Sequence, residues 1–380
     1  SDRLIVFDNV EDFEDLAGVV PQGAGLRVVA TARSREASSA WEAVEVGVLP
    51  RPDSIGLVQS ITGSQDDKAA DAVAERLGDL PLALAQAAET ARIERWTLAE
   101  YLVRLEAFSS DRVIRRIPDD SYADDVSIAL LMAADSALGR IKGSLRGTAR
   151  RQLGALAVLA ESGVPTRWLD PQADADKTYR DANARDDAAD NARCALTALL
   201  NASVAQQTAD GGVTMLHRLQ AQVLRENWND GERAEAFAAA ADVLDRVNVD
   251  SLPRSNAAGR RRETLDLIDQ LRAIAAQDYS HPLFECEQIR IHLHYAFAHA
   301  NDLGLSYEAL TLCNAVNAVG SVVGADHPDT LTFRNDLASA YESAGRLDDA
   351  IPLFEAVVVD SERLLGADHA HTLVSLNNLA

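Results

Sequence analysis

Residues 324–338 read GADHPDTLTFRNDLA, and residues 366–380 read GADHAHTLVSLNNLA. The two stretches share a Gly-Ala-Asp-His start, a Thr-Leu pair and an Asn-x-Leu-Ala end, at a shift of 42 residues. A weaker copy precedes them, because Gly345 has a counterpart at Gly304, 41 residues earlier. Self-similarity with a period of about 20–50 residues indicates units that stack to bury a shared core. We therefore predict that the end of the chain is a stack of similar units.

The clear unit resembles a tetratricopeptide helix pair in its pattern of small and large residues. Ala338 and Ala350 would let two helices approach closely, and Tyr341 and Phe354 would fill the space between neighbouring pairs. We expect antiparallel helix pairs, forming an α-solenoid of tetratricopeptide repeats, over residues 281–380.

The repeat length sets the expected helices of the clear unit. We predict a first helix near residues 328–343 and a second near residues 347–364. A unit of 42 residues exceeds the common form of about 34, so each helix should be about one turn longer. Stacked helix pairs create a long concave surface, and the partner expected on it is a protein or a peptide.

The composition favours packed helices and excludes several classes of partner. The chain has 380 residues, of which 47% are hydrophobic but only 5% aromatic, and its formal net charge is −23. The electrostatic field of a chain with this negative charge repels nucleic acid and anionic membranes. The three cysteines form no CxxC motif, and no apolar run reaches membrane-spanning length. We expect a cytoplasmic protein without membrane attachment or direct nucleic-acid binding.

The front of the chain has the pattern of a covered parallel sheet. Residues 4–7, 27–33 and 43–48 are predicted strands, joined by a turn and a brief helix near residues 11–16. Read together, they are typical of the trailing half of a doubly wound α/β domain of the P-loop NTPase type. We assign residues 1–50 to it.

The remaining chain is predicted to be mainly α. Four helices are expected within a helical lid domain at residues 51–108: 53–61, 67–77, 81–93 and 98–108. A polar linker follows at 109–125. Residues 126–228 end in helix, strand, Gly-Gly turn and strand, an order typical of a winged helix. A helical connector at 229–280 would lead into the repeats.

Four residues are candidates for a nucleotide site. Asp8 ends a buried strand, where its carboxylate could hold magnesium through water, although many strands simply end in aspartate. Arg33 also follows a strand and could face a terminal phosphate, or lie in an ordinary solvated loop. Pro81 suits a first helical position and His217 a capping position, and each could instead contact a ligand.

The other histidines offer no comparable pattern. His292, His294 and His299 share one predicted helix, and we expect no carboxylate near them at ligand spacing. We interpret them as packing and surface residues.

A phosphate-binding loop is missing from this chain. Such a loop needs Gly-x4-Gly-Lys-Ser/Thr, so that backbone N–H groups and the lysine hold the phosphates. The only Lys-Ser/Thr pair is Lys177-Thr178, and Pro171 and Asp176 stand where the glycines should be. We expect the chain to be the back part of a larger switch protein and not to hydrolyse ATP by itself.

The order of the motifs resembles the NB-ARC branch of the STAND signalling ATPases, in the bacterial form with C-terminal tetratricopeptide repeats. The matching segments are LIVFDN at residues 4–9, VVATAR at 28–33, LGDLPLALAQAA at 77–88 and LHRL at 216–219. The resemblance covers essentially the whole chain.

This resemblance implies a role for each candidate residue. Residues 4–9 match the Walker B segment, so Asp8 would hold magnesium, and Arg33 matches the arginine that reports the γ-phosphate. Pro81 falls in the GLPL motif, whose proline packs on the base, and His217 matches the MHD histidine that contacts the β-phosphate of ADP.

The sequence also departs from the family pattern. Asn9 replaces the second acid of the fuller Walker B pair and cannot act as a general base. Asp79 stands in the GLPL run, and Arg218 replaces the aspartate of MHD.

The function that follows from the resemblance is regulation. ADP would hold a closed form and ATP with magnesium would favour an open form that assembles into homo-oligomers, while the repeats bind a protein or peptide. Two alternatives remain: a scaffold whose repeats alone act, and a transcription regulator with a DNA-binding effector in an N-terminal part outside this chain.

Overall fold

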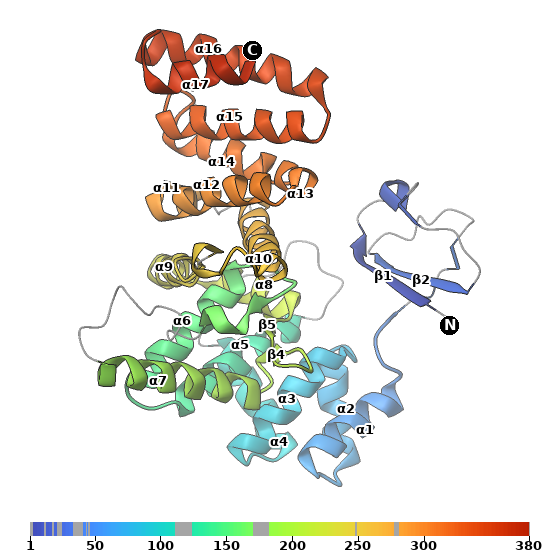
Figure 1. Ribbon diagram of the computed structural model, residues 1–380. Coiled ribbons are helices and arrows are strands. Elements are labelled where there is room, and N and C mark those ends of the chain that lie inside the picture. Colours follow the sequence, from blue (N-terminus) through green and yellow to red (C-terminus); the bar gives the residue numbers. More distant parts are fainter. Residues whose placement is uncertain are drawn as a thin grey trace. The chain divides into compact units, whose positions relative to one another are not determined.

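The computed structural model is mainly helical and divides into two compact units, residues 1–49 and 50–380 (Figure 1). We describe each unit by itself. The described residues are 3–10, 13–16, 19–20, 25–32, 41–42, 44, 46–110, 124–169, 182–247, 249–276 and 281–379.

The first unit contains a two-stranded parallel sheet. Strand β1 (Arg3–Val10) pairs with β2 (Leu26–Ala32), and Ile5 lies opposite Val28. A short 3-10 helix, η1 (Phe13–Leu16), follows β1. Two of the three predicted strands therefore form, and their runs of β-branched residues explain why.

The third predicted strand, at residues 43–48, is wrong for the part that the structure describes. Residues 44 and 46–48 lie outside any strand and pair with no neighbour. Val44 and Val46 are 80% and 93% exposed, so no apolar face is buried that could stabilise a strand here.

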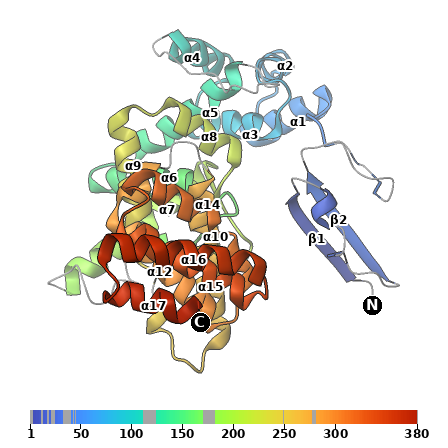
Figure 2. The ribbon, with the colours of Figure 1, turned by 90° about the horizontal axis from the view of Figure 1, so that it is seen from above.

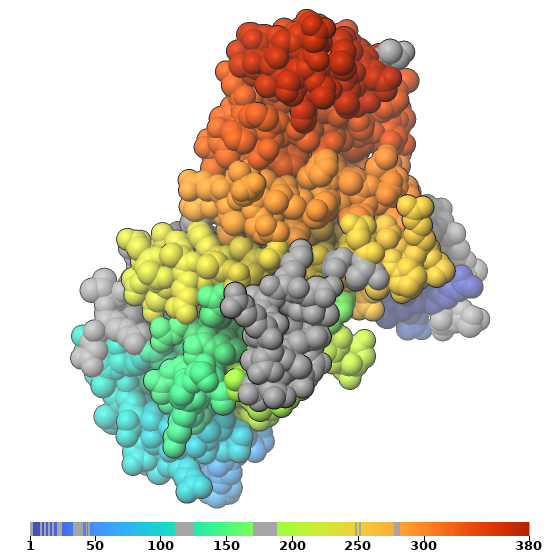
Figure 3. Space-filling view, turned by 60° about the vertical axis from the view of Figure 1, so that its left-hand side comes forward, coloured from blue at the N-terminus to red at the C-terminus, as the bar shows by residue number. Residues whose placement is uncertain are grey.

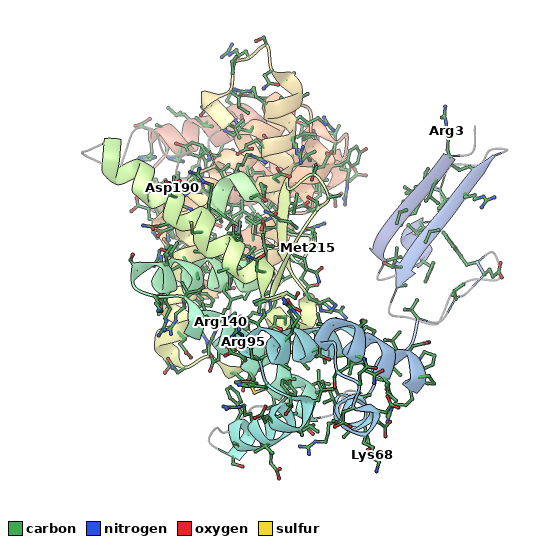
Figure 4. All side chains as sticks on the ribbon, turned by 90° about the horizontal axis from the view of Figure 1, so that it is seen from below. Arg3, Lys68, Arg95, Arg140, Asp190 and Met215 are labelled. Atoms are coloured by element: carbon green, nitrogen blue, oxygen red, sulfur yellow. The ribbon has the colours of Figure 1, made fainter. Side chains whose placement is uncertain are left out.

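The second unit begins with four helices, as predicted from the breakers between them. They are α1 (Arg51–Thr62), α2 (Asp67–Arg76), α3 (Pro81–Glu94) and α4 (Leu98–Ser110). Helix α3 packs on α5 (Asp124–Arg140), and Arg140 Nη1 donates to Glu94 Oε1 over 2.8 Å. Figure 4 labels Arg140 and Arg95 at this junction.

A small antiparallel sheet lies among the next helices. After α6 (Ser144–Val158) come β3 (Val164–Pro165), the 3-10 helix η2 (Thr166–Leu169), α7 (Ala182–Asn201), β4 (Ala205–Gln207) and β5 (Val213–Leu216). The strand order is β3-β5-β4, with β5 antiparallel to both neighbours. Helices α8 (Arg218–Asn227) and α9 (Asp230–Leu244) complete this region.

Helix α10 (Ala257–Ala275) follows the short 3-10 helix η4 (Val249–Ser251) and is joined to the small sheet by buried polar groups. Gln270 is 1% exposed, and its Oε1 accepts from the Ala160 N–H over 2.8 Å. Its Nε2 donates to the Gly163 carbonyl over 3.0 Å. Nearby, the Trp168 indole donates to Glu263 of α10 over 2.7 Å.

The end of the chain is a stack of helices, drawn orange to red in Figures 1, 2 and 3. Its members are α11 (His281–Glu285), α12 (Glu287–Asp302), α13 (Ser306–Leu310), α14 (Cys313–Val323), α15 (Pro328–Ser343), α16 (Leu347–Leu365) and α17 (Ala370–Leu379). Helices α15 and α16 agree with the predicted helix pair, and the predicted Ala338, Ala350 and Phe354 form its buried core, with Tyr341 packed against it.

The repeated Gly-x-x-His-x-x-Thr pattern has a physical explanation in both copies. Gly324 and Gly366 follow the preceding helix at φ values of 102° and 94°, which suit glycine. The imidazoles of His327 and His369 cap the next helix, each Nδ1 accepting the N–H two residues on. A buried threonine six residues after each glycine donates to the glycine carbonyl, over 2.7 and 2.8 Å.

No helix in the described ranges is long and apolar enough to cross a membrane.

We expect the change Gln270→Leu to destabilise the second unit, because it keeps the side-chain volume but leaves the Ala160 N–H and the Gly163 carbonyl unpaired. Each such group costs about 1–3 kcal/mol, so the loss for the two groups should be about 2–6 kcal/mol. Urea denaturation of the wild type and the variant measures it. The control is Gln65→Leu, at an exposed glutamine. If both changes lower the free energy of unfolding by the same small amount, the role given to Gln270 is contradicted.

Candidate functional site

A groove crosses the first helices of the repeats, α12, α15 and α17. It consists of two adjoining pockets of about 190 and 280 Å³, the first between α12 and α15 and the second between α15 and α17. Both are lined by His294, Asn335 and Asp336. We call this surface the repeat groove.

Polar pairs join neighbouring first helices in and beside the repeat groove. The ring Nδ1 of His294 donates to Asp336 Oδ2 over 3.1 Å, and Asn378 Nδ2 donates to Asn335 Oδ1 over 3.2 Å. The residues of the two pairs are 42 and 43 positions apart in the sequence. Each pair thus links a helix to its counterpart in the next repeat.

The interpretation of His294 as a residue without a nearby carboxylate is therefore wrong. The carboxylate of Asp336 comes from the next repeat rather than from the same helix. The hydrogen bond to Asp336 raises the pKa of His294, so the ring carries more charge near neutral pH than a free histidine does. The repeat period of 42 was the signal in the sequence that could have revealed the pair.

The Asn335–Asn378 pair leaves groups free for a ligand. Each asparagine side chain has one carbonyl oxygen and two N–H donors. Within the ranges that the structure describes, the mutual bond is the only side-chain hydrogen bond of either amide. Donors and an acceptor therefore remain in the groove, and they match the alternating groups of an extended peptide backbone.

Two of the four predicted nucleotide-site residues cannot be placed. Arg33 lies outside the described residues, and of Asp8 only the backbone, within β1, is described. The magnesium role of Asp8 stays a prediction. Within the described residues, no group of three or more His, Cys, Asp or Glu side chains could hold a metal ion.

Pro81 begins α3 and is exposed. The turn before it is held by Arg51, whose Nε and Nη2 donate to the two carboxylate oxygens of Asp79 over 2.8 and 3.0 Å. This bidentate pair lowers the pKa of Asp79. Asp79, a departure from the family pattern, thus has a structural partner, and its φ of 57° shows the left-handed conformation of a turn.

His217 is the N-cap of α8, directly after β5. Its Nδ1 accepts the Leu219 N–H over 3.2 Å. His217 therefore caps the helix, which is one of the two roles that the sequence suggested for it. Desolvation and the neighbouring charge of Arg218 lower the pKa of His217, which favours the neutral ring that capping requires. Helices α3 and α8, which carry Pro81 and His217, both pack on α5.

We expect the cap at His217 to make stability depend on pH. Because the folded pKa lies below the unfolded value of about 6.5, the contribution is complete above that value and is lost as pH falls through the folded pKa. His217→Asn keeps a cap that does not titrate. Its free energy of unfolding should match the wild type at pH 8 and exceed it at pH 5. A difference that does not change with pH would contradict this assignment.

Comparison with known proteins identifies one segment. Residues 330–371 match the model of the tetratricopeptide repeat family. These residues comprise most of α15, all of α16 and the start of α17. No curated protein matches the chain. A tetratricopeptide repeat indicates protein–protein interaction, and the matched segment supplies part of the lining of the repeat groove, from α15, α16 and the start of α17.

Proposed function

We propose that the chain binds an extended segment of a partner protein in the repeat groove. The observation that carries this proposal is the free hydrogen-bonding capacity of Asn335 and Asn378 within a groove formed by helices of the matched repeat. Phe297, Ala309 and Ala340 supply apolar surface beside these amides. Backbone recognition by amides and side-chain recognition by pockets together are typical of peptide-binding surfaces.

The double change Asn335→Ala and Asn378→Ala should weaken the binding of peptides to the repeat groove. Losing two hydrogen bonds of about 0.5–1.5 kcal/mol each should lower affinity about tenfold. Peptides from a displayed random library, selected on the full 380-residue chain, are titrated against wild type and variant by calorimetry.

The matched control is Asn314→Ala with Asn317→Ala, two exposed asparagines of α14 outside both pockets. The proposal fails if the selected peptides bind the groove variant as tightly as they bind the wild type. Circular dichroism of the variants shows whether the helices are retained.

A second proposal concerns nucleotide control. We infer that residues 126–228 form a winged helix that contacts ADP through His217 in a protein that also has a phosphate-binding loop. Two observations support it: the strand order β3-β5-β4 with α7 between β3 and β4, and the position of His217 immediately after β5. Pro81 at the start of α3 would pack on the base, and Asp8 and Arg33 would face magnesium and the γ-phosphate.

The change His217→Ala should speed ADP release from the full-length protein about tenfold or more, because it removes a hydrogen bond to a charged phosphate that contributes about 1.5–3 kcal/mol. Release of a fluorescent ADP analogue in stopped flow measures the rate. His327→Ala is a matched control, since it also removes a histidine cap: His327 caps α15 by accepting the Asp329 N–H at Nδ1 over 3.1 Å. Equal release rates in the two variants would exclude His217 from the site, and no ADP binding by the wild type would favour the scaffold alternative.

A further inference from the structure

A cavity outside the repeat groove lies where helices α5, α6, α8 and α9 meet (Figure 1). Its volume is about 400 Å³, which falls within the ~300–1,000 Å³ that is usual for small-molecule sites. We call this cavity the four-helix pocket. Its size suits a whole small molecule.

Much of the lining of the four-helix pocket is apolar. Gly154 of α6 and Ala236 of α9 both line it, and an added Cβ atom at Gly154 would come within 3.0 Å of Ala236. The two residues therefore form one continuous wall. The other apolar residues of the lining are Leu131, Ala134, Leu138, Leu153, Leu224 and Trp228. Leu138 and Trp228 are partly exposed, so a ligand can reach their surfaces.

Two side chains of opposite charge at the four-helix pocket are uncommitted. Arg150 of α6 is exposed, Glu235 of α9 is partly exposed, and both line the pocket. Among the residues that the structure describes, neither side chain has a hydrogen-bond or ion-pair partner, and the two are not paired with each other. Both charges are therefore accessible to a ligand.

The other charged groups nearby are already in use. Glu232 Oε2 accepts the Asn229 N–H over 3.0 Å, within the capping box of α9. Asp135 of α5 lines the pocket but already interacts with another group of the chain. Arg151, the next residue after Arg150, pairs with Asp242 and lines a different pocket.

These features select among small molecules. An apolar body would cover the accessible surfaces of Leu138 and Trp228, which removes apolar area from water. An ammonium group can pair with Glu235, and a carboxylate can pair with the guanidinium of Arg150. A simple amine or a simple carboxylic acid would use only one of the two charges. A peptide carries its two charges at opposite ends, whereas a free α-amino acid carries both on one carbon atom.

We propose that the four-helix pocket binds a free α-amino acid with an apolar side chain, its ammonium group at Glu235 and its carboxylate at Arg150. The side chain of the ligand lies on the apolar wall beside Trp228. No residue of the repeat groove lines this pocket, so the proposal does not depend on peptide binding there.

The test uses L-phenylalanine, phenethylamine and hydrocinnamate, which share one apolar body and carry both charges, only the ammonium or only the carboxylate. Each is titrated into the isotope-labelled 380-residue chain. The indole N–H signal of Trp228 in NMR spectra, assigned with the variant Trp228→Phe, reports binding. We expect L-phenylalanine to bind at least about threefold more tightly than either analogue, because each analogue lacks one ion pair.

Two variants separate the charges. In Arg150→Gln, L-phenylalanine should bind no more tightly than phenethylamine, because the partner of its carboxylate is gone. In Glu235→Gln, it should bind no more tightly than hydrocinnamate. The matched control is Arg151→Gln, which removes an arginine from the same helix outside the pocket and should keep the preference for L-phenylalanine.

Equal affinities of the three compounds in the wild type would make the pocket a purely apolar cavity and overturn the inference. Tighter binding of either analogue would overturn it too, as would a preference for L-phenylalanine that persists in Arg150→Gln or in Glu235→Gln. The absence of a saturable shift of the Trp228 signal would exclude the site altogether.

Discussion

The hydrogen bond from a buried threonine to the glycine carbonyl six residues earlier is the interaction on which the repeat stack depends. It fixes where one repeat ends and the next begins, at Gly324 with Thr330 and again at Gly366 with Thr372. The histidine cap between glycine and threonine then starts each first helix. Because the same turn occurs twice, α15 and α17 start in the same way, and their exposed sides form one surface.

The repeat groove follows from this regular stacking. Helices placed one period apart bring residues about 42 positions apart into contact, which is how Asp336 reaches His294 and Asn378 reaches Asn335. These bonds connect neighbouring repeats at the same surface that a peptide would cover. In the proposed complex, the side chains that join the repeats would therefore also take part in recognition, through the amide groups that their mutual bond leaves unused.

The helices and strands were predicted well where neighbouring residues, such as helix breakers and caps, define their ends. Breakers and caps near Gly78, Pro81 and Gly345 gave the helices of residues 51–110 and the pair α15–α16, because helix ends depend on neighbouring residues. The strand at 43–48 was wrong, since a strand also needs a partner that its own pattern does not reveal. A concave surface on the repeats was expected, but its side-chain pairs were missed for a similar reason, because the bond between His294 and Asp336 joins two different repeats.

The buried bonds of Gln270 affect how force passes through the second unit. The amide of this α10 side chain bonds to the backbone on both sides of the turn before β3, so α10 cannot rotate against that turn without breaking both bonds. The Trp168–Glu263 bond restrains the same joint at a second point along the helix. We therefore expect α10 and the small sheet to move together under load, because a pivot between them would break these three bonds.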